Sequence, residues 1–426
     1  MSDAMPTDPA APPAEHVALL GRVVTPDEAI DDGAVVLAGG RVVWVGPRAA
    51  AASASRREVV DAVAAAPQPE PGTLVLPGLV DLHNHGGGGA SFNDDRDAEA
   101  TMVAVREHRR HGTTTMLASL VTADRATLLA RVEVLAGLAE DGEVAGIHVE
   151  GPFLSHARRG AQSPENLLTG DAGLVRELAE AAGGHLRTMT VAPEVDGVVG
   201  GGGAAEALVS AGAIPSLGHT DATAEQAEAL LAQVVADLTA AAAGGEPPRR
   251  MTATHLFNGM RPLHHRAPGP VAACLAAAAR GDLVVELVAD DVHLAPATVR
   301  SVIATVGADN VALVTDAMAA TGMADGSYEL GPMAVTVTGG VARLTDPDDP
   351  DGGSIAGGTA HLIDVVRRTV AAGVPLADAV RSASWVPARA LGLGDVGGLV
   401  VGHRADVVVT DADLRVRRVL RDGVPA

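Results

Sequence analysis

Apolar residues along the middle of the chain alternate between two patterns. Short runs rich in Val, Ile, Leu and Thr predict buried strands, and the amphipathic or Ala-rich stretches between them predict helices. The strands are expected over 73–83, 113–119, 145–150, 187–193, 213–219, 251–257, 284–290 and 311–316, and the helices over 98–111, 125–140, 172–182, 224–242, 270–280 and 296–306. Eight strand–helix units indicate an α/β fold, a closed parallel (β/α)8 TIM-like barrel. A doubly wound open sheet is the alternative, but no GxGxxG follows the first strand.

The two ends of the chain carry a different pattern. Short apolar strands alternate there with turns, and Gly39-Gly40 between two apolar runs is typical of a hairpin turn. We therefore expect a small β-sandwich domain formed jointly by residues 15–72 and 396–426. The barrel is expected to occupy residues 73–395.

Three further segments lie outside these patterns. Residues 1–14 are acidic and proline-rich and lack the apolar core of a signal peptide, so a flexible tail is expected. A Gly-rich hairpin over 327–345 interrupts the alternation after the eighth strand, and a helix over 357–372 resumes it. No run of about 18 uncharged apolar residues predicts a membrane span.

Charge and cysteine content narrow the possible partners and the compartment. The 426 residues include 31 basic and 53 acidic ones, a formal charge of −22, which argues against binding to nucleic acid or to an anionic membrane. The one cysteine, Cys274, has no partner in the chain for a disulfide, which suits a reducing cytosol, so we expect a cytoplasmic protein. Every basic residue is an arginine, because the sequence contains no lysine.

Candidate metal ligands stand at the ends of five of the expected strands. His83 and His85 follow the first strand and, two residues apart in extended backbone, point to the same side. The third, fifth, sixth and eighth strands end at Glu150, His219, His255 and Asp316. Barrel enzymes keep their active sites at this end of the strands. Each residue alone is more often a satisfied polar side chain, but the whole set indicates a metal site.

The chemistry of these ligands indicates a hydrolytic metal centre. Imidazole and carboxylate ligands suit Zn²⁺ or Fe²⁺ better than Mg²⁺ or Ca²⁺, which prefer oxygen ligands. Such an ion can lower the pKa of bound water to about 7. Two ions at one site need a bridging group, which in some barrels is a carbamylated lysine. Because this chain has no lysine, Glu150 is the only reasonable bridge.

The motifs around these ligands resemble those of a known enzyme family. The segments DLHNHGGGG, HVEGPF, GHTDAT, THLFNGM and VTDAM are similar to motifs of the N-acetylglucosamine-6-phosphate deacetylases, in the amidohydrolase superfamily. The likeness extends over roughly residues 75–420, and a flanking sheet domain is also typical of the family. The resemblance implies removal of acetate from N-acetyl-D-glucosamine 6-phosphate, in amino-sugar catabolism or cell-wall recycling.

The resemblance also implies a role for each candidate ligand. One ion would be held by Glu150, His219 and His255, and a second by His83, His85, Glu150 and Asp316. Some family members lack the His-x-His pair and use one ion, so the presence of the pair favours two ions, of Zn²⁺ or Fe²⁺. Asp316 would act as general base toward the metal-bound water and then as general acid toward the departing amine.

Family positions that contact the substrate also have counterparts here. By the resemblance these are Ala161, Gln162, Asn258, Gly259, Arg266, Asp290, His293, Ile355, Ala356 and Gly357. Arg266 would bind the phosphate, for which a planar guanidinium is suited. The family often supplies this arginine from the neighbouring subunit, which implies a homodimer. His293 would make a second phosphate or hydroxyl contact, and the loop over 354–358 would close over the sugar.

One position departs from the family pattern. After HVEGPF the family usually has Gly-(Ala/Thr)-His, with the histidine directed toward the acetyl carbonyl, whereas this chain has Gly160-Ala161-Gln162. Glutamine can donate a hydrogen bond but cannot carry charge. Either a second metal polarises more of the carbonyl, or the substrate differs, or the activity is reduced.

Two other interpretations stay open. Another amidohydrolase, acting on a different N-acyl amino sugar or on a cyclic amide, would use the same kind of metal centre. A barrel without activity that serves as a scaffold is the alternative outside enzymes, and the complete set of ligands argues against it. The remaining histidines, among them His111, His148, His264, His265 and His361, are expected to be structural or exposed.

Overall fold

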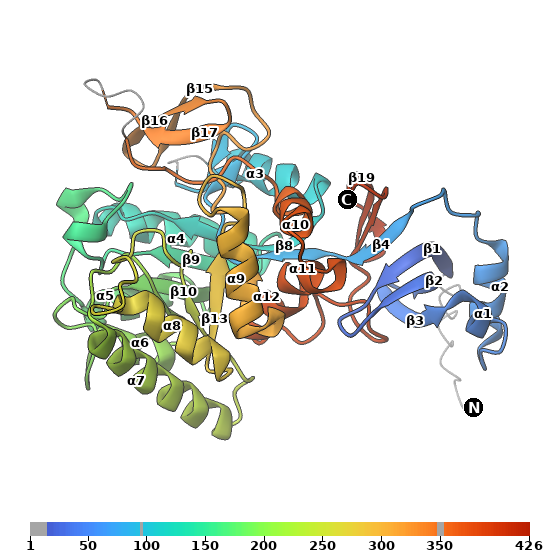
Figure 1. The fold of residues 1–426 in the computed structure, drawn as a ribbon, viewed down its shortest axis with the longest axis horizontal. Helices are drawn as coiled ribbons and strands as arrows, with labels where there is room; N and C mark the ends of the chain where they lie inside the picture. The colour runs from blue at the N-terminus through green and yellow to red at the C-terminus, as the bar shows by residue number, and fades with distance from the viewer. Residues whose placement is uncertain (1–14, 94–96, 347–352) are drawn as a thin grey trace, which may run out of the picture.

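The computed structural model describes residues 15–93, 97–346 and 353–426 (Figure 1), so the tail predicted over 1–14 lies outside the described residues. The middle of the chain forms an eight-stranded parallel sheet whose strands lie side by side in chain order. Its strands are β5 (Leu79–Asp81), β8 (Thr113–Leu120), β9 (Gly146–Glu150), β10 (Leu186–Val191), β11 (Ile214–Leu217), β12 (Met251–Ala253), β13 (Leu283–Leu287) and β14 (Val311–Leu313). Each predicted barrel strand overlaps one of these, which confirms the eight-stranded barrel.

The barrel closes just beyond the ends of its first and last strands. The backbone N–H of Asp316 donates to the carbonyl of His83 at 2.9 Å, and that of His85 donates to the carbonyl of Ala317 at 2.7 Å. A parallel bridge joins Asn84 to Ala317. The closure therefore brings His83, His85 and Asp316 together, although most of the barrel separates them in sequence.

Helices surround the barrel, and most begin where the sequence predicts (Figure 1). They are α3 (Ala98–Arg110), α4 (Arg125–Glu140), α5 (Ala172–Ala181), α6 (Ala204–Ser210), α7 (Ala224–Ala243), α8 (Gly269–Ala279), α9 (Pro296–Val306), α10 (Leu362–Ala371), α11 (Leu376–Ser382) and α12 (Trp385–Ala390), with short 3₁₀ turns η1 (His156–Arg158), η2 (Pro164–Asn166) and η3 (Ala308–Asn310). Asp97, Asp124 and Asp171 cap the first turns of α3, α4 and α5, and Thr223 forms a capping box at α7. These side chains satisfy N–H groups that the first turn leaves free.

Strands from both chain ends form one separate sheet, as the sequence predicts (Figure 1). Its order is β20-β19-β18-β4-β1-β2-β3. The bounds are β1 (Val17–Val24), β2 (Ala29–Ala38), β3 (Arg41–Pro47), β4 (Leu74–Pro77), β18 (Val407–Thr410), β19 (Val416–Arg421) and β20 (Val424–Pro425), with α1 (Arg48–Ala51) and α2 (Arg57–Ala65) beside them. The strand predicted over 73–83 is divided at Gly78: β4 belongs to this sheet and β5 to the barrel. A side chain at Gly78 would collide with Thr114, so the division needs glycine there.

A three-stranded sheet sits at the end of the barrel where the strands exit (Figure 1). It consists of β15 (Gly326–Leu330), β16 (Met333–Thr338) and β17 (Val341–Leu344), so the predicted hairpin has a third strand. Its apolar side packs on Val121, Ala161 and Met318. The helix predicted over 357–372 begins only at Leu362, because the preceding residues join the strand exits: the N–H of Gly358 donates to the Asp316 carbonyl at 2.6 Å. A small hairpin, β6 (Gly86–Gly87) and β7 (Ala90–Ser91), follows His85.

The core is packed mainly from Ala, Val and Leu, as the low aromatic content requires. Cys274 on α8 is fully buried, and burial raises the pKa of its thiol to about 12. Among the residues that the structure describes, none of the helices combines the length and apolar character needed to cross a bilayer.

Candidate active site at the barrel mouth

A cavity of about 480 Å³ opens at the C-terminal ends of the barrel strands. Five of the six predicted ligands line it: His85, Glu150, His219, His255 and Asp316. The sixth, His83, is fully buried against Glu150 and Asp316. The structure thus brings together all six residues that the sequence placed at strand ends.

Glu150, the last residue of β9, stands between two pairs of histidines. Its Oε1 lies 2.9 Å from Nε2 of His219 and 2.8 Å from Nε2 of His255. Its Oε2 lies 3.2 Å from Nε2 of His85 and 3.6 Å from Nε2 of His83. One carboxylate therefore offers each oxygen to a different pair of imidazoles, which is the arrangement that a bridge between two cations needs.

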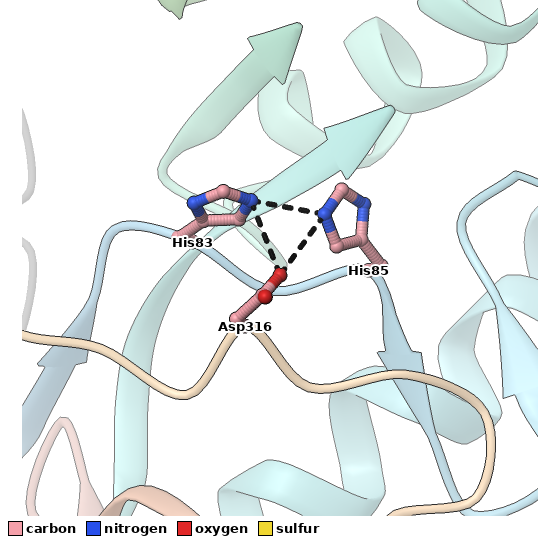
Figure 2. A group of neighbouring side chains, drawn as sticks. All are labelled: His83, His85 and Asp316. Carbon is pink, nitrogen blue, oxygen red and sulfur yellow. Dashed lines mark hydrogen bonds and ion pairs between the residues drawn. The ribbon is translucent and has the colours of Figure 1, made fainter. Parts of the chain in front are cut away.

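His83, His85 and Asp316 point toward a common centre from two loops that follow β5 and β14 (Figure 2). The Nε2 atoms of His83 and His85 are 2.9 Å apart, and Oδ1 of Asp316 lies 3.4 Å from each. Donor atoms of two imidazoles and a carboxylate at these separations fit a Zn²⁺ or Fe²⁺ ion among them.

Backbone carbonyls fix the orientation of two of the ligand rings. Nδ1 of His219 lies 2.8 Å from the Arg158 carbonyl, and Nδ1 of His85 lies 3.1 Å from the Ser119 carbonyl. A carbonyl oxygen can only accept, so Nδ1 carries a proton and Nε2 is the ring nitrogen that faces the carboxylates. A ring held in this way would offer the lone pair of Nε2 to a metal ion once the Nε2 proton is released.

Two buried carboxylates beneath the site were not singled out from the sequence. Glu286 on β13 places Oε2 3.4 Å from Nδ1 of His83. Asp81 on β5 accepts hydrogen bonds from Thr315 and Asn84, yet burial raises its pKa to about 6. A charged residue inside an apolar strand, as in VVEL and LVDL, is the signal that could have identified both.

The histidines around the site keep its two carboxylates ionised. Burial alone would raise the pKa of Glu150, but the charges of His83 and His219 hold it well below its usual range. Burial likewise opposes ionisation of Asp316, and the charge of His83 with the hydrogen bond from His85 lowers its pKa below the ordinary 3.8. An ionised Asp316 is ready to accept a proton.

Three ligands have backbone conformations that L residues rarely adopt. The φ angles are +47° at His219, +26° at His255 and +49° at Asp316. Such conformations cost about 1–3 kcal/mol each and persist where the surrounding structure imposes them, commonly at functional sites. Here they turn the chain sharply at the strand exits and direct these side chains into the mouth.

Asp290 holds His293 close to Asp316. Oδ2 of Asp290 accepts a hydrogen bond from Nδ1 of His293 at 2.8 Å, which leaves Nε2 of His293 3.7 Å from Oδ2 of Asp316. His293 lines the cavity, while Asp290 supports it from behind. Both residues thus lie beside the candidate metal ligands.

Gln162 is bound on both sides of its amide. Its Oε1 accepts the backbone N–H of Thr122 at 2.8 Å, and its Nε2 donates to Oε2 of Glu150 at 2.7 Å. The bond from Thr122 fixes which end of the amide faces Glu150, because a backbone N–H needs an acceptor. Gln162 therefore restrains the carboxylate oxygen that faces His83 and His85, and it also lines the cavity.

The other predicted substrate contacts fall into two groups. Lining the cavity are Ala161, Asn258, Gly259, Ile355 and Gly357. Ala356 is buried beside them, and Arg266 is exposed, with Nη1 2.7 Å from Nε2 of His265. Arg266 does not line the cavity of a single chain.

Two arginines that the sequence did not single out also line the cavity. Nε of Arg158 pairs with Asp221 at 2.8 Å. Arg343 on β17 donates from Nη1 to the Gly353 carbonyl at 2.9 Å. They bring positive charge to a wall made of loops, and no spacing in the sequence marks Arg343 as part of that wall.

Comparisons with known proteins agree with this geometry. Residues 74–425 match the amidohydrolase family. An N-acetylglucosamine-6-phosphate deacetylase of Bacillus subtilis (strain 168) is 33% identical over 355 residues, 81% of this chain and 82% of the relative. An N-acetylgalactosamine-6-phosphate deacetylase of Escherichia coli O157:H7 is 32% identical over 86% of this chain and 93% of its own.

Solved structures give the same result over nearly the whole chain. N-acetyl-D-glucosamine-6-phosphate deacetylase of Mycobacterium smegmatis superimposes with a TM-score of 0.82 at 40% identity, covering 96% of this chain and 100% of its own. The N-acetylglucosamine-6-phosphate deacetylase of Thermotoga maritima gives a TM-score of 0.76 at 26% identity, covering 96% and 99%. With its barrel, terminal sheet and strand-end ligands, the chain belongs to the N-acetylglucosamine-6-phosphate deacetylases of the amidohydrolase family.

Proposed function

We propose that this chain hydrolyses the amide of N-acetyl-D-glucosamine 6-phosphate to give D-glucosamine 6-phosphate and acetate. The observation that carries the proposal is Glu150, whose two oxygens face two separate imidazole pairs within a cavity of about 480 Å³. The names of the relatives supply the substrate class. A cytosolic location, in amino-sugar catabolism or cell-wall recycling, is part of the same proposal.

Two divalent ions, Zn²⁺ or Fe²⁺, are proposed per chain. Glu150, His219 and His255 would hold the first, and His83 and His85 with Glu150 and Asp316 the second. When bound, such ions supply a Lewis acid for the acetyl carbonyl and lower the pKa of water. The absence of lysine supports Glu150 as the shared ligand.

Asp316 would carry the proton through the reaction. Its carboxylate is ionised, because the pKa is held below its ordinary value, and it can take a proton from the attacking water. As the bond between the carbonyl carbon and the nitrogen breaks, the same proton passes to the departing amine. His293, 3.7 Å away, would keep the second oxygen of Asp316 in place.

The loop wall of the cavity would orient the sugar phosphate. By the family likeness Arg266 of one chain would reach the phosphate in the cavity of the other, which makes a homodimer part of the proposal. Arg343 lines the cavity within the same chain and is a second guanidinium suited to a phosphate dianion. In this proposal Arg266 of the partner chain and Arg343 of the same chain both contact the phosphate.

A second candidate is deacetylation of the galactosamine epimer. The Escherichia coli relative with that name is as similar to this chain as a glucosamine relative is, at 32% identity each. Gln162 supports this candidate, because the family usually has a histidine at this position and a different residue there is compatible with a different sugar.

The deciding experiment measures acetate release from N-acetylglucosamine, N-acetylgalactosamine and their 6-phosphates, with the Glu150→Gln chain as a blank. We expect the 6-phosphate of N-acetylglucosamine to have the highest kcat/KM. Equal rates on phosphorylated and free sugars would contradict the phosphate assignment. Absence of acetate from all four substrates would contradict the proposed reaction.

A further inference from the structure

A second group of imidazole and carboxylate side chains lies outside the cavity. Glu107 is on α3, and His111 immediately follows that helix, four residues on, so both face the same side. His361 caps the start of α10. One donor atom from each of the three lies within 4.8 Å of the others. We propose that Glu107, His111 and His361 form a separate site for a divalent transition-metal ion such as Zn²⁺.

The distances around Glu107 fit a single small cation. Its Oε1 lies 2.9 Å from Nε2 of His361 and 3.4 Å from Nδ1 of His111. Metal–ligand bonds of about 2.0–2.1 Å in a tetrahedron place neighbouring donor atoms roughly 3.3 Å apart. Arg110 pairs with the other oxygen, Oε2, so Oε1 is the one left for an ion.

The space beside these donor atoms is kept free by a glycine. Gly322, with φ of +79°, approaches so closely that a Cβ there would overlap Oε1 of Glu107. The side chains of Glu107 and His361 are 10% and 9% exposed, whereas His111 is 38% exposed. The site is therefore closed on the protein side and open toward water, which can complete the coordination.

His111 is the ligand that must move when an ion binds. Its ring stacks on that of His361 with centroids 3.6 Å apart and planes 17° from parallel. Nδ1 of His111 also donates to the Glu107 carbonyl at 2.9 Å, and binding gives up this bond. His111 is half-exposed and can turn.

An ion here would stabilise the packing of the segments that surround the barrel mouth. It would join the end of α3 to the start of α10 beside the loop that follows Asp316. Thr321 and Ala319 of that loop accept hydrogen bonds of 2.8 Å from Gly88 and Gly89, in the hairpin after His85. The role is therefore structural, and His111 takes no part in the proposed reaction.

The test counts Zn²⁺ in the full chain after the active-site bridge is removed. The chain with Glu150→Gln is stripped with a chelator, and Zn²⁺ binding is titrated against a chromogenic zinc indicator. We expect this chain to bind one Zn²⁺ ion. Adding His111→Ala should abolish this zinc binding. His111→Cys should keep it, because a thiolate binds zinc. His264→Ala, the matched substitution of another exposed histidine, should leave zinc binding unchanged.

The same substitution in the chain with Glu150 intact gives a second readout. His111→Ala should lower the zinc content by one ion and leave acetate release unchanged. If the Glu150→Gln chain binds no zinc, or binds zinc that His111→Ala does not remove, the second site is disproved. If that chain binds more than one ion and His111→Ala removes one of them, the second site stands and the bridging role of Glu150 is wrong.

Discussion

The floor of the cavity, made by the strand-end ligands, differs in construction from its loop wall, made by residues such as Arg158, Asn258 and Arg343. On the floor, Glu150 alone has four imidazole nitrogens within 3.6 Å, and carbonyls fix the rings of His85 and His219 from behind. On the wall, Arg343 donates to the Gly353 carbonyl and Arg158 pairs with Asp221, and both side chains are partly exposed. A floor of this kind sets the chemistry, while a wall of loops can set the substrate, because changing it disturbs no buried charge.

The largest expected effect comes from removing the charge at the centre of the floor. Glu150→Gln should abolish acetate release and the binding of both active-site ions, since an amide offers one weak oxygen in place of two charged ones. Metal content after dialysis and acetate release measure this. Glu286→Gln is the matched control: Oε2 of Glu286 lies 3.4 Å from Nδ1 of His83 and accepts the backbone N–H of His255 at 3.3 Å. An amide oxygen can still accept that N–H, so we expect only about a 10- to 100-fold loss of affinity for the ion at His83. Full metal content in Glu150→Gln would contradict the bridge.

Asp316→Asn should reduce turnover by about 10²–10⁴ while the ion at His219 and His255 remains. The loss reflects proton transfer, because the amide cannot accept the proton from water. In the unmodified chain the pKa of Asp316 lies below 3.8, so its base form is lost only as the pH falls below that value. We therefore expect no acidic limb from Asp316 in kcat/KM above pH about 4. Turnover of Asp316→Asn equal to that of the unmodified chain would remove this residue from the reaction.

Substitutions of the two arginines proposed to bind the phosphate should affect only the phosphorylated substrate. Arg266→Ala and Arg343→Ala should each raise KM for the 6-phosphate roughly 10- to 100-fold, the value of a lost charge-assisted bond. The free sugar should be nearly unaffected. An equal rise in KM for the 6-phosphate and for the free sugar would indicate that the arginine has a structural role.

Arg266 also allows a test of its action between subunits. Mixing Arg266→Ala chains with Asp316→Asn chains should restore acetate release at low KM in mixed dimers, because one cavity would then have both an intact Asp316 and an intact Arg266 from the partner chain. If the activity of the mixture equals the sum of the activities of the two variants, Arg266 acts within its own chain.

The smallest effect is expected at Gln162, where the floor meets the wall. Gln162→His should raise turnover by less than about tenfold, because a charged donor makes a hydrogen bond about twice as strong as a neutral one. The gain should be larger in a His83→Ala background, where the second ion is lost. Lower activity in both backgrounds would indicate that Gln162 is suited to another acyl group or sugar. The bonds of Gln162 to Thr122 and Glu150 make some loss of rigidity a competing effect.

The residues of the floor could be predicted because periodicity places strand ends, and parallel strands end at one edge. His83, His85, Glu150, His219, His255 and Asp316 follow from that rule, as does the eight-stranded count. The rule fails where a strand is interrupted. The apolar run over 73–83 looks continuous, but it is divided at Gly78 into β4, which belongs to the terminal sheet, and β5, which belongs to the barrel.

Only the tertiary structure decided which atoms meet. That Oε1 and Oε2 of Glu150 face different histidine pairs depends on the left-handed turns at His219 and His255, which no pattern of apolar residues encodes. Arg343 reaches the cavity through a separate sheet, and His361 meets Glu107 across 254 residues of sequence. Such contacts depend on how the barrel closes and how loops pack on its mouth, whereas periodicity reports only whether a residue is buried within its own element.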